Sequence, residues 1–271
     1  MRDDQEREIL EILQSKKKAS TEELAEKLYV SPSTVRRKLN ALQKKGLAVR
    51  IHGGAQIGDG SEFLPSFATR SHQNAPEKKR IALTAARLIR NGDLIFLDGS
   101  SSAFFIAGQL SGFKNVKVVT NGIDTLSLLS RAGVEAYSTG GRISPANRSV
   151  LVGHYAEEMI SSLHADIAFF SAQSVAADGE VYDCFEEENV LRRKMLQGAS
   201  RSVLLCDSTK FRKTSPFRLC ALSDVDCLVS DRDGRPLLDA DDLPQLLFPC
   251  PQTDDKTDIG RRKKTTARPP L

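Results

Sequence analysis

The segment Leu28-Tyr29-Val30-Ser31-Pro32-Ser33-Thr34-Val35-Arg36-Arg37-Lys38-Leu39 decides the fold of the first part of the chain. Its first five residues predict a tight turn. Ser31 and Pro32 then predict a helix start, because serine is a preferred N-cap and proline is favoured at the first helical position. The apolar residues that follow, beginning with Val35, recur at helical spacing and turn one face inward, and Gly46 ends the helix. The polar and basic residues of this helix are therefore expected to face outward.

The sequence on both sides of this helix completes a small domain. Residues 3–15 predict a first helix, and Ser20 with Glu23 three residues later predicts the start of a second. Residues 47–57 place two short β-type runs around a pair of glycines, which predicts a hairpin. Three short helices and a hairpin in this order predict a winged helix-turn-helix over residues 1–57.

The net charge is concentrated in this domain. The 271-residue chain has a formal charge of +4, and residues 1–57 hold 12 Lys or Arg against 8 Asp or Glu. Residues 31–57 hold six of these cations and no carboxylate. The asymmetry suggests a polyanion partner, most simply nucleic acid, and a solvated basic helix face explains the charge equally well. The cap, the turn, the charge and the hairpin together favour double-stranded DNA. The candidate DNA-binding residues are Ser31, Ser33, Thr34, Arg36, Arg37, Lys38, Arg50, His52 and Gly53.

The rest of the chain divides into three parts. Residues 58–76 contain Gly, Pro and Ser and predict a linker. Residues 77–235 alternate short β-type runs with helical segments, which predicts an α/β domain with a mainly parallel sheet. Residues 236–271 lose this alternation and predict a C-terminal extension that is disordered from about residue 251. The expected strands are Leu94–Leu97, Val116–Val119, Val134–Tyr137, Ile167–Phe170, Val203–Leu205 and Cys227–Val229, with helices near 77–89, 102–111, 123–132, 153–163 and 186–200.

Small polar residues follow several of the expected strands. Ligands of parallel α/β sheets bind outside the carboxyl ends of the strands. Residues 99–102 offer backbone N–H groups and hydroxyls that suit a phosphate, although serine is also an ordinary N-cap. Carboxylates accept hydrogen bonds from sugar hydroxyls, and basic residues supply countercharge. The candidate effector-binding residues are Asp98, Gly99, Ser100, Ser101, Ser102, Thr120, Asn121, Gly140, Gly141, Asp183, Glu188, Arg192 and Lys210.

Composition excludes several other classes of protein. The longest apolar runs fall far short of the ~20 residues that span a bilayer, and the polar first residues do not form a signal peptide. Five cysteines without a CxxC pair argue against a disulfide framework and fit the reducing cytoplasm. Four histidines without HxxxH spacing give no metal site, and no cofactor is expected.

The chain resembles the DeoR-type transcriptional regulators from about residue 5 to residue 232. The resemblance rests on Ser31–Arg37 with Leu39, Arg50–Ala55, Leu97-Asp98 with its Gly/Ser loop, Thr120-Asn121, Gly140-Gly141, Asp166–Phe169, Glu188 with Arg192, and Asp207–Lys210. Lys38 departs from the family, which usually has an acidic residue there, and Arg192 stands where many members carry lysine.

This resemblance implies a function. It implies a homo-oligomeric repressor of a sugar-metabolism operon, with a C-terminal domain that resembles ribose-5-phosphate isomerase and binds a phosphorylated sugar. The expectation is a regulator and not an enzyme. Two alternatives stay open. One is a sugar-phosphate isomerase fused to a DNA-binding module, in which Asp98, Asp183 or Glu188 would move a proton. The other is a structural DNA-bundling protein, which leaves the polar strand ends unexplained.

Overall fold

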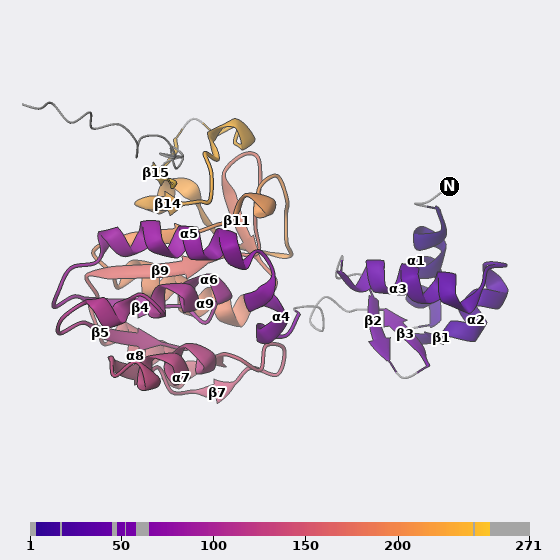
Figure 1. The fold of residues 1–271 in the computed structure, drawn as a ribbon, viewed down its shortest axis with the longest axis horizontal. Helices are drawn as coiled ribbons and strands as arrows, with labels where there is room; N and C mark the ends of the chain where they lie inside the picture. Colours follow the sequence, from indigo (N-terminus) through magenta and orange to yellow (C-terminus); the bar gives the residue numbers. More distant parts are fainter. Residues whose placement is uncertain are drawn as a thin grey trace, which may run out of the picture.

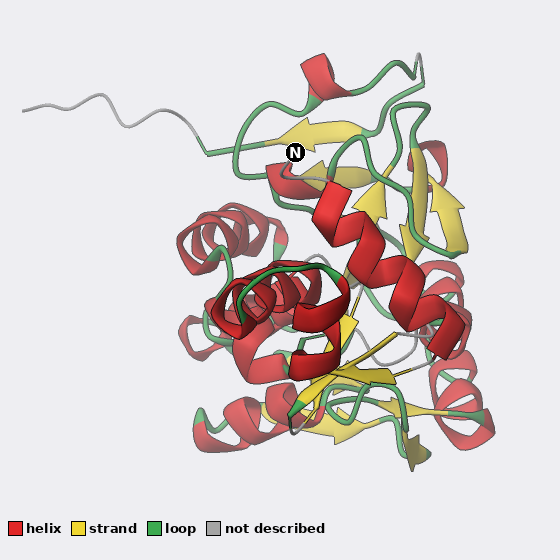
Figure 2. Ribbon diagram, turned by 90° about the vertical axis from the view of Figure 1, so that its right-hand side faces the viewer, coloured by secondary structure: helices red, strands yellow, loops and turns green. Residues whose placement is uncertain are grey.

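The computed structural model describes residues 4–16, 18–44, 48–51, 53–57, 65–240 and 242–249. Helices and strands combine in both the N-terminal and the C-terminal part (Figures 1 and 2). Each part has its own hydrophobic core. Within the described ranges, no helix is both long and apolar enough to cross a membrane.

The N-terminal domain has the predicted winged helix-turn-helix form. Its elements are α1 (Asp4–Lys16), β1 (Lys18–Ser20), α2 (Thr21–Lys27), α3 (Pro32–Lys44), β2 (Ala48–Ile51) and β3 (Gly54–Ile57). The predicted hairpin is present, since β2 and β3 pair antiparallel. A third strand, β1, pairs with the other edge of β3. The sequence does not predict this strand, because three residues are too few to show a β period.

The predicted caps set the starts of α2 and α3. The Ser20 hydroxyl accepts a hydrogen bond from the Glu23 backbone N–H at 3.0 Å. The Ser31 hydroxyl accepts one from the Thr34 N–H at 3.2 Å. Each cap satisfies a backbone donor that a helix start leaves unpaired. The three helices bury one continuous core that contains Ile9, Leu13, Leu24, Val35, Leu39 and Leu42.

The C-terminal domain is built on a seven-stranded sheet with the order β15-β14-β12-β9-β4-β5-β6. Every neighbouring pair in it is parallel. The strands are β4 (Leu94–Leu97), β5 (Lys117–Thr120), β6 (Glu135–Ser138), β9 (Ile167–Ser171), β12 (Ser202–Leu205), β14 (Cys227–Val229) and β15 (Gln245–Leu247). The principal helices are α5 (Ala75–Ala85), α6 (Ser101–Ala107), α7 (Ile123–Arg131), α8 (His154–Ser161) and α9 (Glu186–Gln197). The predicted α/β class is therefore confirmed.

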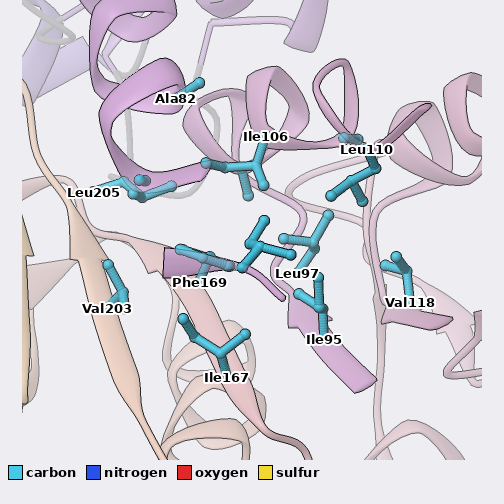
Figure 3. Close-up of a cluster of buried hydrophobic side chains, with 14 of the residues drawn as sticks. Ala82, Ile95, Leu97, Ile106, Leu110, Val118, Ile167, Phe169, Val203 and Leu205 are labelled. Atoms are coloured by element: carbon cyan, nitrogen blue, oxygen red, sulfur yellow. The ribbon is translucent and has the colours of Figure 1, made fainter. Parts of the chain in front are cut away.

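Side chains alternate between the two faces of this sheet, and helices cover both faces. Ile95 and Leu97 of β4 belong to a core cluster with residues of α5, α6 and α7. Figure 3 shows Leu97 and Phe169 below Ile106 of α6 in this cluster. Phe96, between the two β4 residues, packs instead with α8 and α9. Burial on both faces explains why the strands are short apolar runs without a polar alternation.

The chain changes direction across the sheet beside β4. From β4 it runs outward through β5 to β6, and β9, β12, β14 and β15 then follow on the other side of β4. Ligands bind at such switch points in open α/β sheets. The carboxyl ends of β4, β9 and β12 are therefore the expected location of a site.

Several elements differ from the sequence-based expectation. The predicted linker 58–76 contains α4 (Phe67–His72), whose Phe67 ring packs edge-on against Phe104 of α6 at 5.3 Å between centroids. The predicted C-terminal extension contains β15, which pairs with β14. The helix α4 and the strand β15 therefore lie outside the predicted limits 77–235 of the α/β domain, and residues 251–271 lie outside the described residues. The remaining missed strands are β7 (Arg142–Ile143), β8 (Leu151–Val152), β10 (Ser174–Val175), β11 (Glu180–Asp183) and β13 (Phe217–Ala221).

Candidate functional site: a DNA-binding surface and a cationic cavity

The outer face of α3 presents polar and basic side chains. Ser31, Ser33, Arg36 and Arg37 are exposed, and Thr34 is half-buried. The Ser31 hydroxyl lies 2.8 Å from that of Ser33 and 3.0 Å from that of Thr34. The helix carries no acidic residue in its first turn. Hydroxyls and guanidinium groups at the start of a recognition helix have the chemistry that base edges and phosphates require.

Two of the predicted DNA-contact residues lie elsewhere. Lys38 is only 9% exposed, so its predicted place on the open face of α3 is wrong. Arg50 on β2 is half-buried and donates through Nη1 to Asn40 Oδ1 at 2.8 Å. This bond joins the wing to α3, so Arg50 is placed to brace the two elements.

Of the two DNA-contact residues predicted at the tip of the wing, the structure describes only one. His52 lies outside the described residues, and Gly53 is exposed with a φ of 77°. The backbone conformation of Gly53 is in the left-handed region, which favours glycine. Its carbonyl accepts a hydrogen bond from the Thr21 N–H at 2.8 Å, which connects the wing to the start of α2.

A cavity of about 190 Å³ lies at the carboxyl ends of β4, β9 and β12. This cationic cavity is smaller than the ~300–1,000 Å³ typical of drug-sized ligands and suits a small metabolite. Its described lining has five basic and three acidic side chains. The lining residues are Arg70, Gln73, Asn74, Lys78, Ser100, Ser101, Ser102, Ser171, Ala172, Gln173, Asp183, Glu188, Arg192, Asp207, Thr209, Lys210 and Lys213.

One wall of the cavity is a buried charge cluster around Arg192 of α9. The Arg192 guanidinium pairs with Asp98 at 2.8 Å, Asp183 at 3.2 Å and Glu188 at 3.0 Å. Burial lowers the pKa of Arg192, but the three carboxylates outweigh burial and raise its pKa above the ordinary value. Burial also raises the pKa of Glu188, although Arg192 opposes that shift. Asn147 donates to the second oxygen of Glu188 at 2.9 Å.

The cavity lining also carries two lysine amines that no carboxylate of the described residues neutralises at hydrogen-bond distance. The Lys210 Nζ donates to the Ser171 hydroxyl at 2.9 Å and to the Ala172 carbonyl at 2.7 Å. Lys78 is 5% exposed, and its Nζ donates to the carbonyls of Arg70 and Gln73. Burial, followed by the charge of Lys210, lowers the pKa of Lys78 to about 8.

Asp207 lies between these amines. Burial raises its pKa, but Lys210, the bond from Thr209 and Lys78 together outweigh burial and hold the pKa below its ordinary value. Asn74 donates to the same carboxylate at 3.2 Å. An ionised Asp207 therefore offsets part of the positive charge of Lys78 and Lys210. The positive charge that remains can attract an anion.

Three consecutive serines form the floor at the end of β4. Ser100 caps α6, since its hydroxyl accepts from the Ala103 N–H at 3.1 Å. Ser101 and Ser102 are 6% and 1% exposed. The Ser102 hydroxyl is buried and has no hydrogen-bond partner within the described structure. Ser100, Ser101 and Ser102 all belong to the cavity lining, so their hydroxyls and backbone lie beside any bound group.

Seven of the predicted effector residues line the cavity, and six do not. Those in the lining are Ser100, Ser101, Ser102, Asp183, Glu188, Arg192 and Lys210; those outside it are Asp98, Gly99, Thr120, Asn121, Gly140 and Gly141. Asp98 lies beneath the wall, where its carboxylate is occupied by Arg192 and two backbone N–H groups. Gly99 approaches Val150 so closely that a Cβ would collide with it.

Several residues after β5 and β6 bond or pack against other parts of the chain, although a Cβ added at Gly140 would touch nothing and the Asn121 Oδ1 has no partner among the described residues. Asn121 exchanges backbone and side-chain bonds with Leu151 at 2.8 and 3.1 Å. Thr120 accepts from the Gly122 N–H at 3.0 Å. Gly141 has a φ of 93° and lies against the Val152 carbonyl, where a side chain would clash. These residues shape the loops beside β8, and β6 is two strands away from β4.

Sequence reasoning missed ten lining residues. They are Arg70, Gln73, Asn74, Lys78, Ser171, Ala172, Gln173, Asp207, Thr209 and Lys213. The polar run Asp207–Lys210 follows the expected strand Val203–Leu205, which is a usable sequence signal for Asp207 and Thr209. Arg70, Gln73 and Asn74 lay within the predicted linker. No group of three or more His, Cys, Asp and Glu side chains in the described part of the chain is placed to hold a metal ion.

Comparison with known proteins adds a family assignment to this geometry. Residues 73–232 match the family model of the DeoR C terminal sensor domain, and residues 6–60 match that of the DeoR-like helix-turn-helix domain. The L-fucose operon activator of Haemophilus influenzae is 34% identical over 83% of this chain and 90% of its own length. The transcriptional repressor GlcR of Bacillus subtilis is 32% identical over 83% and 86%. The glycerol-3-phosphate regulon repressor of Escherichia coli is 28% identical over 82% and 88%.

Solved structures with a similar α/β part are more distant. Ribose 5-phosphate isomerase A from Methanocaldococcus jannaschii is 17% identical, with a TM-score of 0.39 over 51% of this chain and 54% of that one. The delta subunit of eIF2B from Chaetomium thermophilum is 14% identical, with a TM-score of 0.39 over 55% and 57%.

Proposed function

Because this chain belongs to the DeoR family of transcriptional regulators, we propose that its cationic cavity binds a phosphorylated sugar that modulates operator binding. The observation that carries the proposal is that one cavity lining combines lysine amines with carboxylates. Lys78 and Lys210 supply the amines, and Asp183 and Glu188 supply the carboxylates. A sugar phosphate has the same two parts, an anionic group and a set of hydroxyl donors.

We assign the ligand an orientation from these two sets of side chains. The phosphate lies toward Lys78, Lys210 and the serine floor, where ammonium groups and hydroxyls can bond it. The sugar hydroxyls lie toward Asp183 and Glu188. An ionised carboxylate accepts several hydrogen bonds, so each can keep its bond to Arg192 and still receive one from the ligand.

The Arg192 cluster favours a regulator over the alternative of an isomerase. Isomerisation needs a carboxylate that is free to accept a proton from a sugar carbon. Asp98, Asp183 and Glu188 each form an ion pair with Arg192, so none of the three is a carboxylate without a partner. The relatives named above are also regulators. Turnover of ribose 5-phosphate by the purified chain would contradict this part of the proposal.

The cavity is connected to the DNA-binding domain through α4. Arg70 lines the cavity from α4, and Lys78 holds the carbonyls of Arg70 and Gln73 at the end of this helix. A phosphate that attracts the Lys78 ammonium competes with these carbonyls. Binding of the ligand therefore shifts the position of α4, which directly follows the segment that joins the two domains along the chain.

The family and the geometry of DNA support three further proposals, on repression, oligomeric state and cellular location. We propose a repressor of a sugar-metabolism operon, since GlcR and the glycerol-3-phosphate regulon relative are repressors by name. A homo-oligomer is proposed because paired helix-turn-helix domains read two half-sites on one face of DNA. The relatives are bacterial regulators, and bacterial genes are read in the cytoplasm, where we place this chain.

A charge-insertion variant tests the cavity. Ser101→Asp places a negative charge on the serine floor, so binding of a sugar phosphate should fall sharply by like-charge repulsion. Lys210→Ala removes one of several cations and should weaken binding less. The matched control is Ser127→Asp on α7, which is exposed and outside the cavity lining. Calorimetric titration with the strongest ligand from a thermal-shift screen of phosphorylated sugars gives the readout. Unchanged affinity in Ser101→Asp would place the phosphate elsewhere.

A further inference from the structure

Tyr29, in the turn between α2 and α3, is unusual in both conformation and exposure. Its side chain is 95% exposed, the largest value among the exposed large apolar residues of the described chain. Its φ is 51°, in the left-handed region. Left-handed backbone is uncommon for a bulky residue, and nothing in the N-terminal core requires this ring.

The turn explains the backbone conformation but not the tyrosine. The Val30 N–H bonds the Ala25 carbonyl at 3.0 Å, and the Tyr29 N–H bonds the Glu26 carbonyl at 3.3 Å. These two bonds form the Schellman motif that ends α2, and Tyr29 occupies the position at which glycine is usual. Val30 packs on the core of the domain. The fold therefore requires the left-handed turn, and it would be served better by glycine than by an exposed aromatic ring.

The position of Tyr29 points to one partner. It precedes the N-cap of α3 by two residues, and the start of α3 is the end that approaches the bases in a helix-turn-helix. From Ser31 to Ile57 the chain has six basic residues and no carboxylate. A neutral ring with a hydroxyl donor beside such a segment matches the sugar and phosphate groups that border a major groove.

We infer that Tyr29 is a DNA-backbone contact, with its hydroxyl donating to a phosphate oxygen at the edge of the groove that receives α3. The ring covers the adjacent deoxyribose. The contact is independent of base sequence and positions the recognition helix. This inference rests on the DNA-binding role of α3. It adds a contact from the turn before α3 to the contacts proposed for the basic and hydroxyl side chains of that helix.

Two substitutions in the full chain separate this role from a role in folding. Glycine suits the left-handed turn, so Tyr29→Gly should raise the midpoint of thermal unfolding. The same variant should bind a mixed-sequence 40-base-pair duplex roughly tenfold more weakly, because it loses a hydrogen bond to a charged phosphate. Tyr29→Phe keeps the ring and removes only the hydroxyl, so it should lose most of the same affinity. Tyr155→Phe is the matched control, since Tyr155 is 75% exposed on α8 of the other domain, and it should bind like wild type.

The salt dependence identifies the kind of contact. A neutral hydroxyl releases no counterion, so the Tyr29 variants should keep the wild-type slope of log affinity against log salt, whereas loss of Arg36 should reduce the slope by about one. Wild-type affinity in Tyr29→Phe overturns the inference. So does a Tyr29→Gly variant whose oligomer mass changes in sedimentation while its DNA affinity does not, because the ring then contacts protein. If Arg36→Ala, Arg37→Ala also binds normally, the DNA-binding role of α3 itself fails.

Discussion

Arg192 of α9 donates through Nε to Oδ2 of Asp98 at 2.8 Å, and the two side chains are 6% and 1% exposed. The Asp98 carboxylate also accepts the backbone N–H groups of Ser100 at 3.1 Å and Ser171 at 3.2 Å. One carboxylate therefore joins the ends of β4 and β9 to α9, directly beneath the cavity. Its role is to hold the serine floor and the acidic wall in register.

Replacement of Arg192 should destabilise the C-terminal domain strongly. Arg192→Met leaves three buried carboxylates without their cation, and breaking a buried ion pair in this way costs about 3–5 kcal/mol. The measurement is the free energy of unfolding in urea. Arg142→Met is the control, because its pair with Glu187 is half-exposed and should contribute less than about 1 kcal/mol. Equal losses in the two variants would show that the buried cluster does not support the fold.

The affinity for the sugar phosphate should fall as the pH rises through about 8. The pKa of Lys78 is lowered to about 8, first by burial and then by Lys210, so its ammonium is lost above that pH. A phosphate is already doubly charged there, since its second pKa is about 6. The phosphate favours the charged amine, so binding takes up a proton above pH 8, and affinity should drop toward tenfold per pH unit.

The Lys78 variant isolates this effect. Calorimetric titration between pH 7 and pH 9.5 should show the decline in wild type, and Lys78→Met should bind more weakly at pH 7 with a nearly flat profile. Lys79→Met is the control, because Lys79 is the exposed neighbour on the same helix. An identical pH profile in wild type and Lys78→Met would assign the titration to another group.

The fold could be predicted from sequence wherever an element has a long enough pattern. Leu94–Leu97 and Ile167–Ser171 are apolar runs buried on both faces, and each is bounded by turn residues. The antiparallel strands β10, β11 and β13 were missed because β10 has only two residues, β11 contains a register shift between Val181 and Tyr182, and β13 begins with two exposed residues. The strand β15 was missed because only half-buried leucines mark it.

The site could be predicted only in part, because strand order is not visible in the sequence. The loops after β4 and β12 reach the cavity, since both strands lie beside β9. The loops after β5 and β6 have the same polar composition, but these strands lie on the far side of the switch point. Arg70 was missed because the six residues of α4 are too few to show a helical period.

The basic face of α3 should carry operator binding. Arg36→Ala or Arg37→Ala should cost about 1–3 kcal/mol of operator affinity if the side chain reads a base. If it contacts only phosphate, the loss should be similar on all sequences and the salt slope should fall by about one. Gel shifts on selected and scrambled duplexes distinguish the two cases. Lys38→Ala is informative, because Lys38 is buried and its loss should affect stability more than base selection. Wild-type affinity in the double Arg36, Arg37 variant would refute the assignment.

Two truncations should divide the C-terminal end of the chain into a dispensable and an essential part. Residues 251–271 have few apolar side chains, so their removal should leave unfolding and effector response unchanged. Removal of residues 245–271 also deletes β15, whose Leu246 and Leu247 pack against two different core clusters. That loss should cost about 1.5–3 kcal/mol, because the two leucines are half-buried and complete burial of each would contribute about 1.5–3 kcal/mol. It also exposes β14 as a new sheet edge, which favours aggregation. Urea unfolding and light scattering measure both effects, and a longer truncation as stable and monodisperse as the shorter one would show that β15 does not complete the sheet.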